Sequence, residues 1–68
     1  MTVASNVKQT LASLKGIEST LKIYSVQSRK EEEKKIYKRE LQTVESVIKD
    51  LEDRLKVLEF EEPQYKGN

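Results

Sequence analysis

The sequence contains no cysteine, no histidine and no tryptophan, and these absences restrict the chemistry that the chain can support. Without cysteine there is no disulfide and no thiolate ligand, and without histidine the usual general base and the commonest transition-metal ligand are missing. Catalytic sets that combine serine, histidine and aspartate, or cysteine and histidine, are therefore impossible. We expect no enzymatic activity, no catalytic residue, no cofactor, no metal site and no small-molecule substrate.

An excess of charge of either sign is also lacking, because 13 basic residues face 12 acidic ones and the net charge is +1. Domains that bind nucleic acid normally carry a clear basic excess, so we expect no nucleic-acid partner. The uncharged stretches are far shorter than the ~20 apolar residues that span a bilayer. Residues 1–6 show no basic segment followed by an apolar one. We therefore expect a cytoplasmic protein without a signal peptide or transmembrane segment.

Residues that interrupt helices are scarce as well, with two glycines and one proline among 68 residues. An apolar stripe with spacings of three or four occupies the first third of the chain: Val7, Leu11, Leu14, Ile17, Leu21 and Tyr24. This spacing predicts an amphipathic helix over about residues 5–26. Its start is open, because three residues are suited to the N-cap: Thr2, Ser5 and Asn6.

An unbroken apolar heptad follows in the second half of the chain: Tyr37, Leu41, Val44, Ile48, Leu51, Leu55 and Leu58. It predicts a second helix over about residues 29–61, whose narrow apolar seam must be covered by another helix. Ser28 and Glu31 fit the capping-box pattern at its start. Pro63 ends it, because the residue before a proline is displaced from the α region. Residues 63–68 would then form a short tail.

These helices predict an all-α fold in which residues 1–62 form an antiparallel hairpin. A bend near Ser28 would place Leu14 opposite about Leu41. Two rows of charge repeat every seven residues, one basic and one acidic: Lys8, Lys15, Lys22 and Glu45, Glu52, Glu59. Antiparallel packing would bring the two rows alongside each other, which favours this orientation. The alternative is that the rows are coincidental and serve solubility.

The greater length of the second helix predicts self-association. Four residues would lie beyond the cover of the first helix: Leu55, Leu58, Phe60 and Tyr65. Two hairpins packed together would cover them and form a four-helix bundle. We therefore expect a homodimer whose interface includes the whole heptad from Tyr37 to Leu58, and an exchange of helices between two chains is a variant of the same hypothesis.

Two further surfaces are candidates for contact with a partner. The first is an uncharged face of the first helix that contains Ala12, Gly16 and Ser19, and small residues at this spacing allow another helix to approach closely. The alternative is an ordinary polar face that happens to lack charge. The second is the C-terminal segment, where Phe60 and Tyr65 could anchor a partner. The alternative there is that both aromatic side chains pack onto the end of the bundle.

The two ends of the chain resemble a family of small proteins of unknown function from spore-forming bacilli and clostridia. The resemblance rests on three segments: Met1-Thr-Val3, Val7-Lys-Gln-Thr-Leu-Ala-Ser-Leu-Lys-Gly16 and Glu61-Glu-Pro-Gln-Tyr-Lys-Gly67. It implies no substrate, cofactor or catalytic residue. It does imply a setting, since members are similar to small proteins encoded beside spore membrane proteins linked to dipicolinate transport and heat resistance.

These observations favour a non-enzymatic helical interaction or accessory module associated with sporulation, located in the cytoplasm of the forespore or spore. Its expected partners are a second copy of itself and a spore membrane protein. The alternative is a peripheral protein that contacts lipid through amphipathic helices, although the helices lack tryptophan and a strongly cationic polar face.

Overall fold

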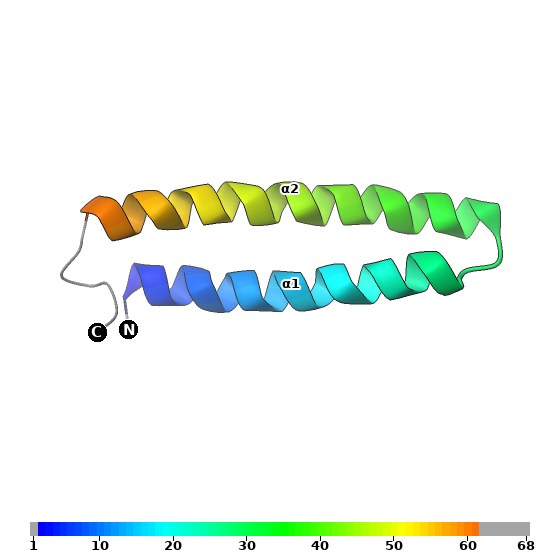
Figure 1. The fold of residues 1–68 in the computed structure, drawn as a ribbon, viewed down its shortest axis with the longest axis horizontal. Coiled ribbons are helices and arrows are strands. Elements are labelled where there is room, and N and C mark those ends of the chain that lie inside the picture. The colour runs from blue at the N-terminus through cyan, green and yellow to red at the C-terminus, as the bar shows by residue number, and fades with distance from the viewer. Residues whose placement is uncertain (1, 62–68) are drawn as a thin grey trace.

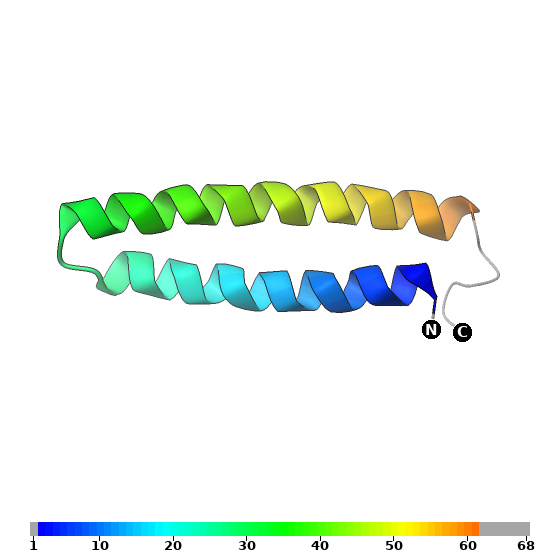
Figure 2. The same cartoon turned by 180° about the vertical axis from the view of Figure 1, so that it is seen from behind.

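Two antiparallel helices form a hairpin in the computed structural model, which describes residues 2–61 (Figure 1). Helix α1 spans Val3–Gln27 and helix α2 spans Glu31–Glu61. The helices run side by side in both views, and no strand is found within residues 2–61 (Figures 1 and 2). The predicted all-α fold with two helices is confirmed, with α1 two residues longer at its start than expected and α2 two residues shorter.

The start of α1 is determined by Thr2. Its side-chain oxygen accepts a hydrogen bond from the backbone N–H of Ser5 at 3.0 Å. This contact satisfies one of the backbone donors that the first turn of a helix leaves free. Of the three N-cap candidates, Thr2 therefore fills the position, and the helix begins at the next residue.

The connection between the helices corrects the predicted capping box. The backbone N–H of Ser28 donates to the carbonyl of Tyr24 at 2.9 Å and ends α1, and the backbone of Ser28 is extended. Ser28 is thus three residues before the first residue of α2, too far to be its N-cap. Its hydroxyl donates to the carboxylate of Glu33 at 3.1 Å instead of forming the predicted pair with Glu31.

The interior of the hairpin is a single narrow seam. On α1 the inward positions follow a heptad that sequence reasoning missed: Ala4, Val7, Leu11, Leu14, Glu18, Leu21 and Ser25. The predicted stripe covers a broader arc, so two of its members lie beside the seam, with Ile17 48% and Tyr24 49% exposed. Glu18 and Ser25 take the inward positions because a heptad selects every 3.5 residues and the apolar pattern departs from that period here.

The interhelical ion pairs fix the register. Lys8 Nζ lies 3.2 Å from a carboxylate oxygen of Glu59, and Lys15 Nζ lies 3.4 Å from one of Glu52. The predicted rows therefore lie alongside each other at these two positions. Each step of seven along α1 matches a step of seven back along α2, so Leu14 lies closer to the level of Ile48 than to that of Leu41.

The predicted register was therefore wrong by about one heptad. The extended connection leads outward, so that α2 begins beyond the last turn of α1 (Figure 1). This shift also changes the cover at the far end of α2, where Leu55 and Leu58 are half-buried rather than uncovered. Phe60 is 86% exposed, which agrees with the prediction that α1 does not cover it.

Candidate interaction surfaces

The hairpin has two broad faces, on which both helices are accessible, and they differ in chemistry. We call the first the ion-paired face and define it by residues that directly follow inward positions: Lys8, Lys15, Lys22, Glu45, Glu52 and Glu59. We call the second the open face and define it by exposed apolar residues: Val3, Ile17, Tyr24, Ile36, Val47 and Val57. The heptad geometry places these two sets on opposite sides of the seam.

On the ion-paired face, charged side chains of the two helices meet across the seam. The two interhelical ion pairs flank a groove lined by Lys8, Leu11, Lys15, Glu52 and Leu55. The lysine stems and carboxylates lie over the apolar residues beneath them, and Leu11 is only 6% exposed. Lys22, the third lysine of the row, pairs with Glu18 of its own helix at 3.9 Å. This face presents charge to its surroundings and has satisfied much of that charge within the chain.

The open face has no such cover. Near the termini it forms a groove lined by two charged residues, Asp53 and Arg54, and by five apolar ones: Val3, Val7, Leu51, Val57 and Leu58. At the other end the rings of Tyr24 and Tyr37 pack with their centroids 5.7 Å apart and their planes tilted by 53°. Between these ends the register places Ile17 opposite Val47, and these side chains are 48% and 42% exposed. Exposed apolar side chains therefore recur along the whole face, and on α2 Glu40 and Arg54 lie on either side of Val47 in the same row.

Burial is skewed toward the ion-paired face. The three buried residues of the described chain are Ala4, Leu11 and Ile48, and all occupy inward positions that lean toward that face. The inward residues that lean toward the open face are all only half-buried: Val7, Leu14, Leu21, Tyr37, Val44, Leu51 and Leu58. No described side chain is less than 2% exposed. The seam is thus buried more deeply on the side of the ion-paired face than on the side of the open face.

Of the seven residues predicted to form an oligomer interface, Ile48 is buried and the other six are half-buried. All seven lie on the side of α2 that contacts α1. They are therefore covered by a helix of their own chain and not by a second copy. Four of them, Tyr37, Val44, Leu51 and Leu58, also border the open face. A contribution of this set to a dimer therefore stays a prediction, with these four best placed for it.

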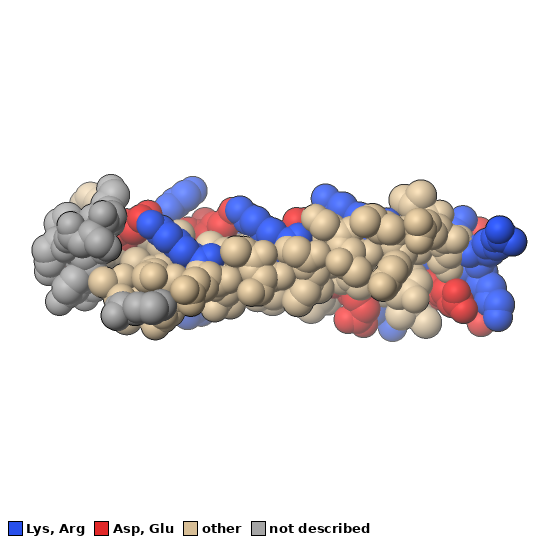
Figure 3. Space-filling model, turned by 90° about the horizontal axis from the view of Figure 1, so that it is seen from below, with Lys and Arg blue, Asp and Glu red and all other residues tan. Residues whose placement is uncertain are grey.

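The outward surfaces of the two helices also differ. Ala12, Gly16 and Ser19 are exposed on α1, and a Cβ added to Gly16 would meet nothing within 4 Å. Seen from the α1 side, the molecule shows a band without charge over most of its length, with lysines along one margin (Figure 3). The partner contacts predicted on α1 are therefore accessible. Phe60 is exposed on α2 rather than on this band, and Tyr65 lies outside the described residues.

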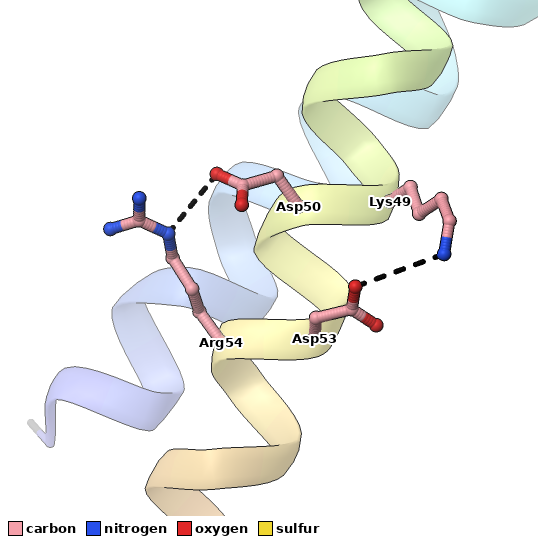
Figure 4. Close-up of polar contacts among 4 residues, drawn as sticks. All are labelled: Lys49, Asp50, Asp53 and Arg54. Carbon is pink, nitrogen blue, oxygen red and sulfur yellow. Dashed lines mark hydrogen bonds and ion pairs between the residues drawn. The ribbon is translucent and has the colours of Figure 1, made fainter.

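Helix α2 carries two ion pairs of its own, one at the margin of the open face, where Arg54 lines the groove, and one on its outward surface. Arg54 Nε lies 3.1 Å from a carboxylate oxygen of Asp50, as the spacing of these residues would favour, and Lys49 Nζ lies 3.8 Å from one of Asp53 (Figure 4). These side chains are largely exposed, so each pair contributes less than about 1 kcal/mol. They make α2 the charged edge of the hairpin and α1 the uncharged one.

The described residues offer few features for chemistry. Within residues 2–61, no group of three histidine, cysteine, aspartate or glutamate side chains is arranged to hold a metal ion. In the same part of the chain, neither helix has a stretch both long and apolar enough to cross a bilayer. What the residues do provide is accessible surface of three kinds: ion-paired, apolar and uncharged polar.

The fold and these surfaces define a two-helix hairpin with one unfilled apolar face. The chain belongs to the family described as protein of unknown function (DUF1657), whose match covers residues 7–55. The match includes the Val7–Gly16 segment, whereas Met1–Val3 and Glu61–Gly67 lie outside it. No curated protein and no solved structure matches the chain.

Proposed function

We propose that the protein is a non-catalytic helical interaction module that acts as a homodimer, in which two hairpins form a four-helix bundle. The observation that carries the proposal is the open face, where large apolar side chains remain exposed, whereas only three of residues 2–61 are buried. A small domain usually needs a disulfide, a metal or a partner chain to become stable. The sequence has neither cysteine nor histidine, and residues 2–61 hold no group arranged to bind a metal ion, so association is the means that we propose.

Sporulation is the setting that we propose for this module. Membership of a family of unknown function is compatible with this role, and the resemblance of the chain ends to small proteins of spore formers supports it. In that setting the protein would be an accessory to a spore membrane protein. Deletion of the gene in a spore-forming host is expected to reduce the survival of heated spores, and unchanged yield and heat survival would contradict this part of the proposal.

Solution mass is the direct test of the dimer. Light scattering over a dilution series is expected to give a mass near twice the 7.9 kDa of the chain. A chain truncated after Glu62 is expected to give the same result, because the open face lies entirely within the described residues. A mass of one chain at every concentration would contradict the proposal. Flotation of the protein with liposomes would instead favour the alternative of a peripheral membrane role.

A further inference from the structure

We infer that the second copy packs on the open face, with the two hairpins antiparallel and a two-fold axis passing near Ile17 and Val47. The inference rests on the proposed function, because it names the surface and the orientation of that dimer. It is carried by three observations on the described residues: the position of the exposed apolar side chains, the size of the face, and the placement of two charges on it.

The exposed apolar residues select the open face over the ion-paired face. A copy on the ion-paired face would have to desolvate Lys8, Lys15, Glu52 and Glu59, which already pair within the chain. Removing paired charges from water costs several kcal/mol per ion unless new partners are supplied. A copy on the open face would cover half-buried residues of the seam and contact Val47, which is 42% exposed. Apolar burial favours association there.

The size of the face suits a stable dimer. The principal extents of the molecule are 50, 16 and 12 Å, so a broad face spans the longest two of these dimensions. The area of a rectangle with these two sides is close to the ~800 Å² that each partner contributes to an interface of standard size. One face of the hairpin is therefore sufficient, provided that the helices of the second copy lie along it rather than across it.

Two charges on the open face select the antiparallel orientation. Glu40 and Arg54 occupy the positions seven residues before and after Val47, in the same row of α2. In an antiparallel dimer α2 packs along α2 of the second copy, and the two-fold axis brings Glu40 beside Arg54 of that copy. In a parallel dimer α2 packs along α1 of the second copy, where the register sets Glu40 opposite Tyr24 and Arg54 opposite Thr10.

Only the antiparallel orientation therefore gives both charges an opposite partner, and symmetry makes two such pairs in each dimer. Arg54 contacts Asp50 through Nε, and its two terminal nitrogens do not take part in that hydrogen bond. A guanidinium can donate several hydrogen bonds at once, so an intermolecular pair with Glu40 is compatible with the intramolecular one.

Single cysteine variants of the intact chain test the surface, because the natural sequence has no thiol of its own. In the proposed dimer Val47→Cys lies beside its own copy, and mild oxidation is expected to link it covalently. Ile23→Cys is the matched control, since Ile23 is 54% exposed but lies on the outward surface of α1. Linkage of Val47→Cys is expected to be roughly 100-fold faster, because the dimer holds its thiols at an effective concentration near millimolar.

Charge reversal tests the orientation. Glu40→Arg and Arg54→Glu are each expected to raise the dissociation constant of the dimer about tenfold, and the double reversal is expected to restore it. Sedimentation measures the constants, and far-ultraviolet circular dichroism verifies that each variant keeps its helix content. Two weakened single variants without recovery in the double variant would overturn the antiparallel orientation.

The remaining outcomes separate this inference from the proposed function. A natural chain that is monomeric at all concentrations would overturn both. A dimeric chain that links through Ile23→Cys faster than through Val47→Cys would retain the dimer and overturn the choice of face. Linkage only in a mixture of Ile17→Cys and Val47→Cys would retain the face and overturn the orientation, because that pair meets in a parallel dimer.

Discussion

Replacing Gly16 with alanine distinguishes the open face from the outward surface of α1 as the site of contact. A Cβ at Gly16 would meet nothing within 4 Å, so the substitution introduces no clash within the hairpin. Alanine is more favourable than glycine in a helix interior by about 1 kcal/mol. Gly16 lies in the middle of α1, and its neighbour Ser19 shares the exposed surface. We therefore expect Gly16→Ala to stabilise the protein by about that amount.

Urea and thermal denaturation followed by circular dichroism measure the change in unfolding free energy and in Tm, at one fixed protein concentration. A gain of about 1 kcal/mol corresponds to a rise of roughly 4–8 °C in Tm for a chain of this size. Ser19→Ala is the matched control, because serine is less favourable than alanine in a helix by about 0.5 kcal/mol. Its side chain is exposed on the same surface, so it is also expected to stabilise the protein, by the smaller amount.

A loss of stability in Gly16→Ala, or a lower mass in solution, would refute this reasoning. It would mean that another helix approaches the backbone of α1 closely at Gly16 and that a methyl group holds it away. In that case Ala12, Gly16 and Ser19 would be the contact between copies, and the open face would need another explanation. Stabilisation with an unchanged mass would leave the outward surface free for a different partner.

Four other single substitutions test the remaining parts of the structure by urea denaturation. Thr2→Ala is expected to cost about 1 kcal/mol through loss of the N-cap, and an unchanged midpoint would show that the cap contributes nothing. Lys15→Glu is expected to lower the free energy of unfolding by less than about 1 kcal/mol, because the Lys15–Glu52 ion pair is exposed. High salt, or the additional substitution Glu52→Lys, is expected to abolish this loss. A loss that does not depend on salt would contradict an exposed ion pair. Ile48→Ala is expected to lower the free energy of unfolding by about 2–4 kcal/mol, because Ile48 is buried. Phe60→Ala is expected to lower it by less than about 0.5 kcal/mol, because Phe60 is exposed. Equal losses would mean that Phe60 is buried against other side chains at the end of α2.

The heptad of α2 could be predicted because its seven members are all apolar and leave one possible seam. The seam of α1 could not, because its pattern is ambiguous. Apolar residues at 17 and 24 compete with Glu18 and Ser25 for the inward positions, and hydrophobicity alone favours the former. The structure selects the latter because the inward positions of α1 must keep step with the heptad of α2 along the whole hairpin.

The register of α1 against α2 depends on the conformation of the connection between them, and the sequence does not indicate that conformation. Ser28 is suited both to end one helix and to begin the next, and a choice between these roles shifts the bend. The charged rows did not settle the register, because both repeat every seven residues and a shift of one heptad would pair Lys8 with Glu52 in place of Glu59. The uncharged outward surface of α1 was recognisable from the sequence alone, because the four charges of α1 all lie at inward or ion-paired positions.

The proposed orientation gives that uncharged surface a consequence. In an antiparallel dimer built on the open face, α1 lies along α1 of the second copy and α2 along α2. The outward surfaces of both α1 helices then share one edge of the four-helix bundle, and the Lys49–Asp53 pairs of both α2 helices share the opposite edge. A parallel dimer would separate the two uncharged surfaces. The charges at Glu40 and Arg54, by selecting the orientation, therefore determine whether a further partner contacts the outward surface of one α1 helix or of two adjacent ones. Two adjacent α1 helices expose twice the area for docking.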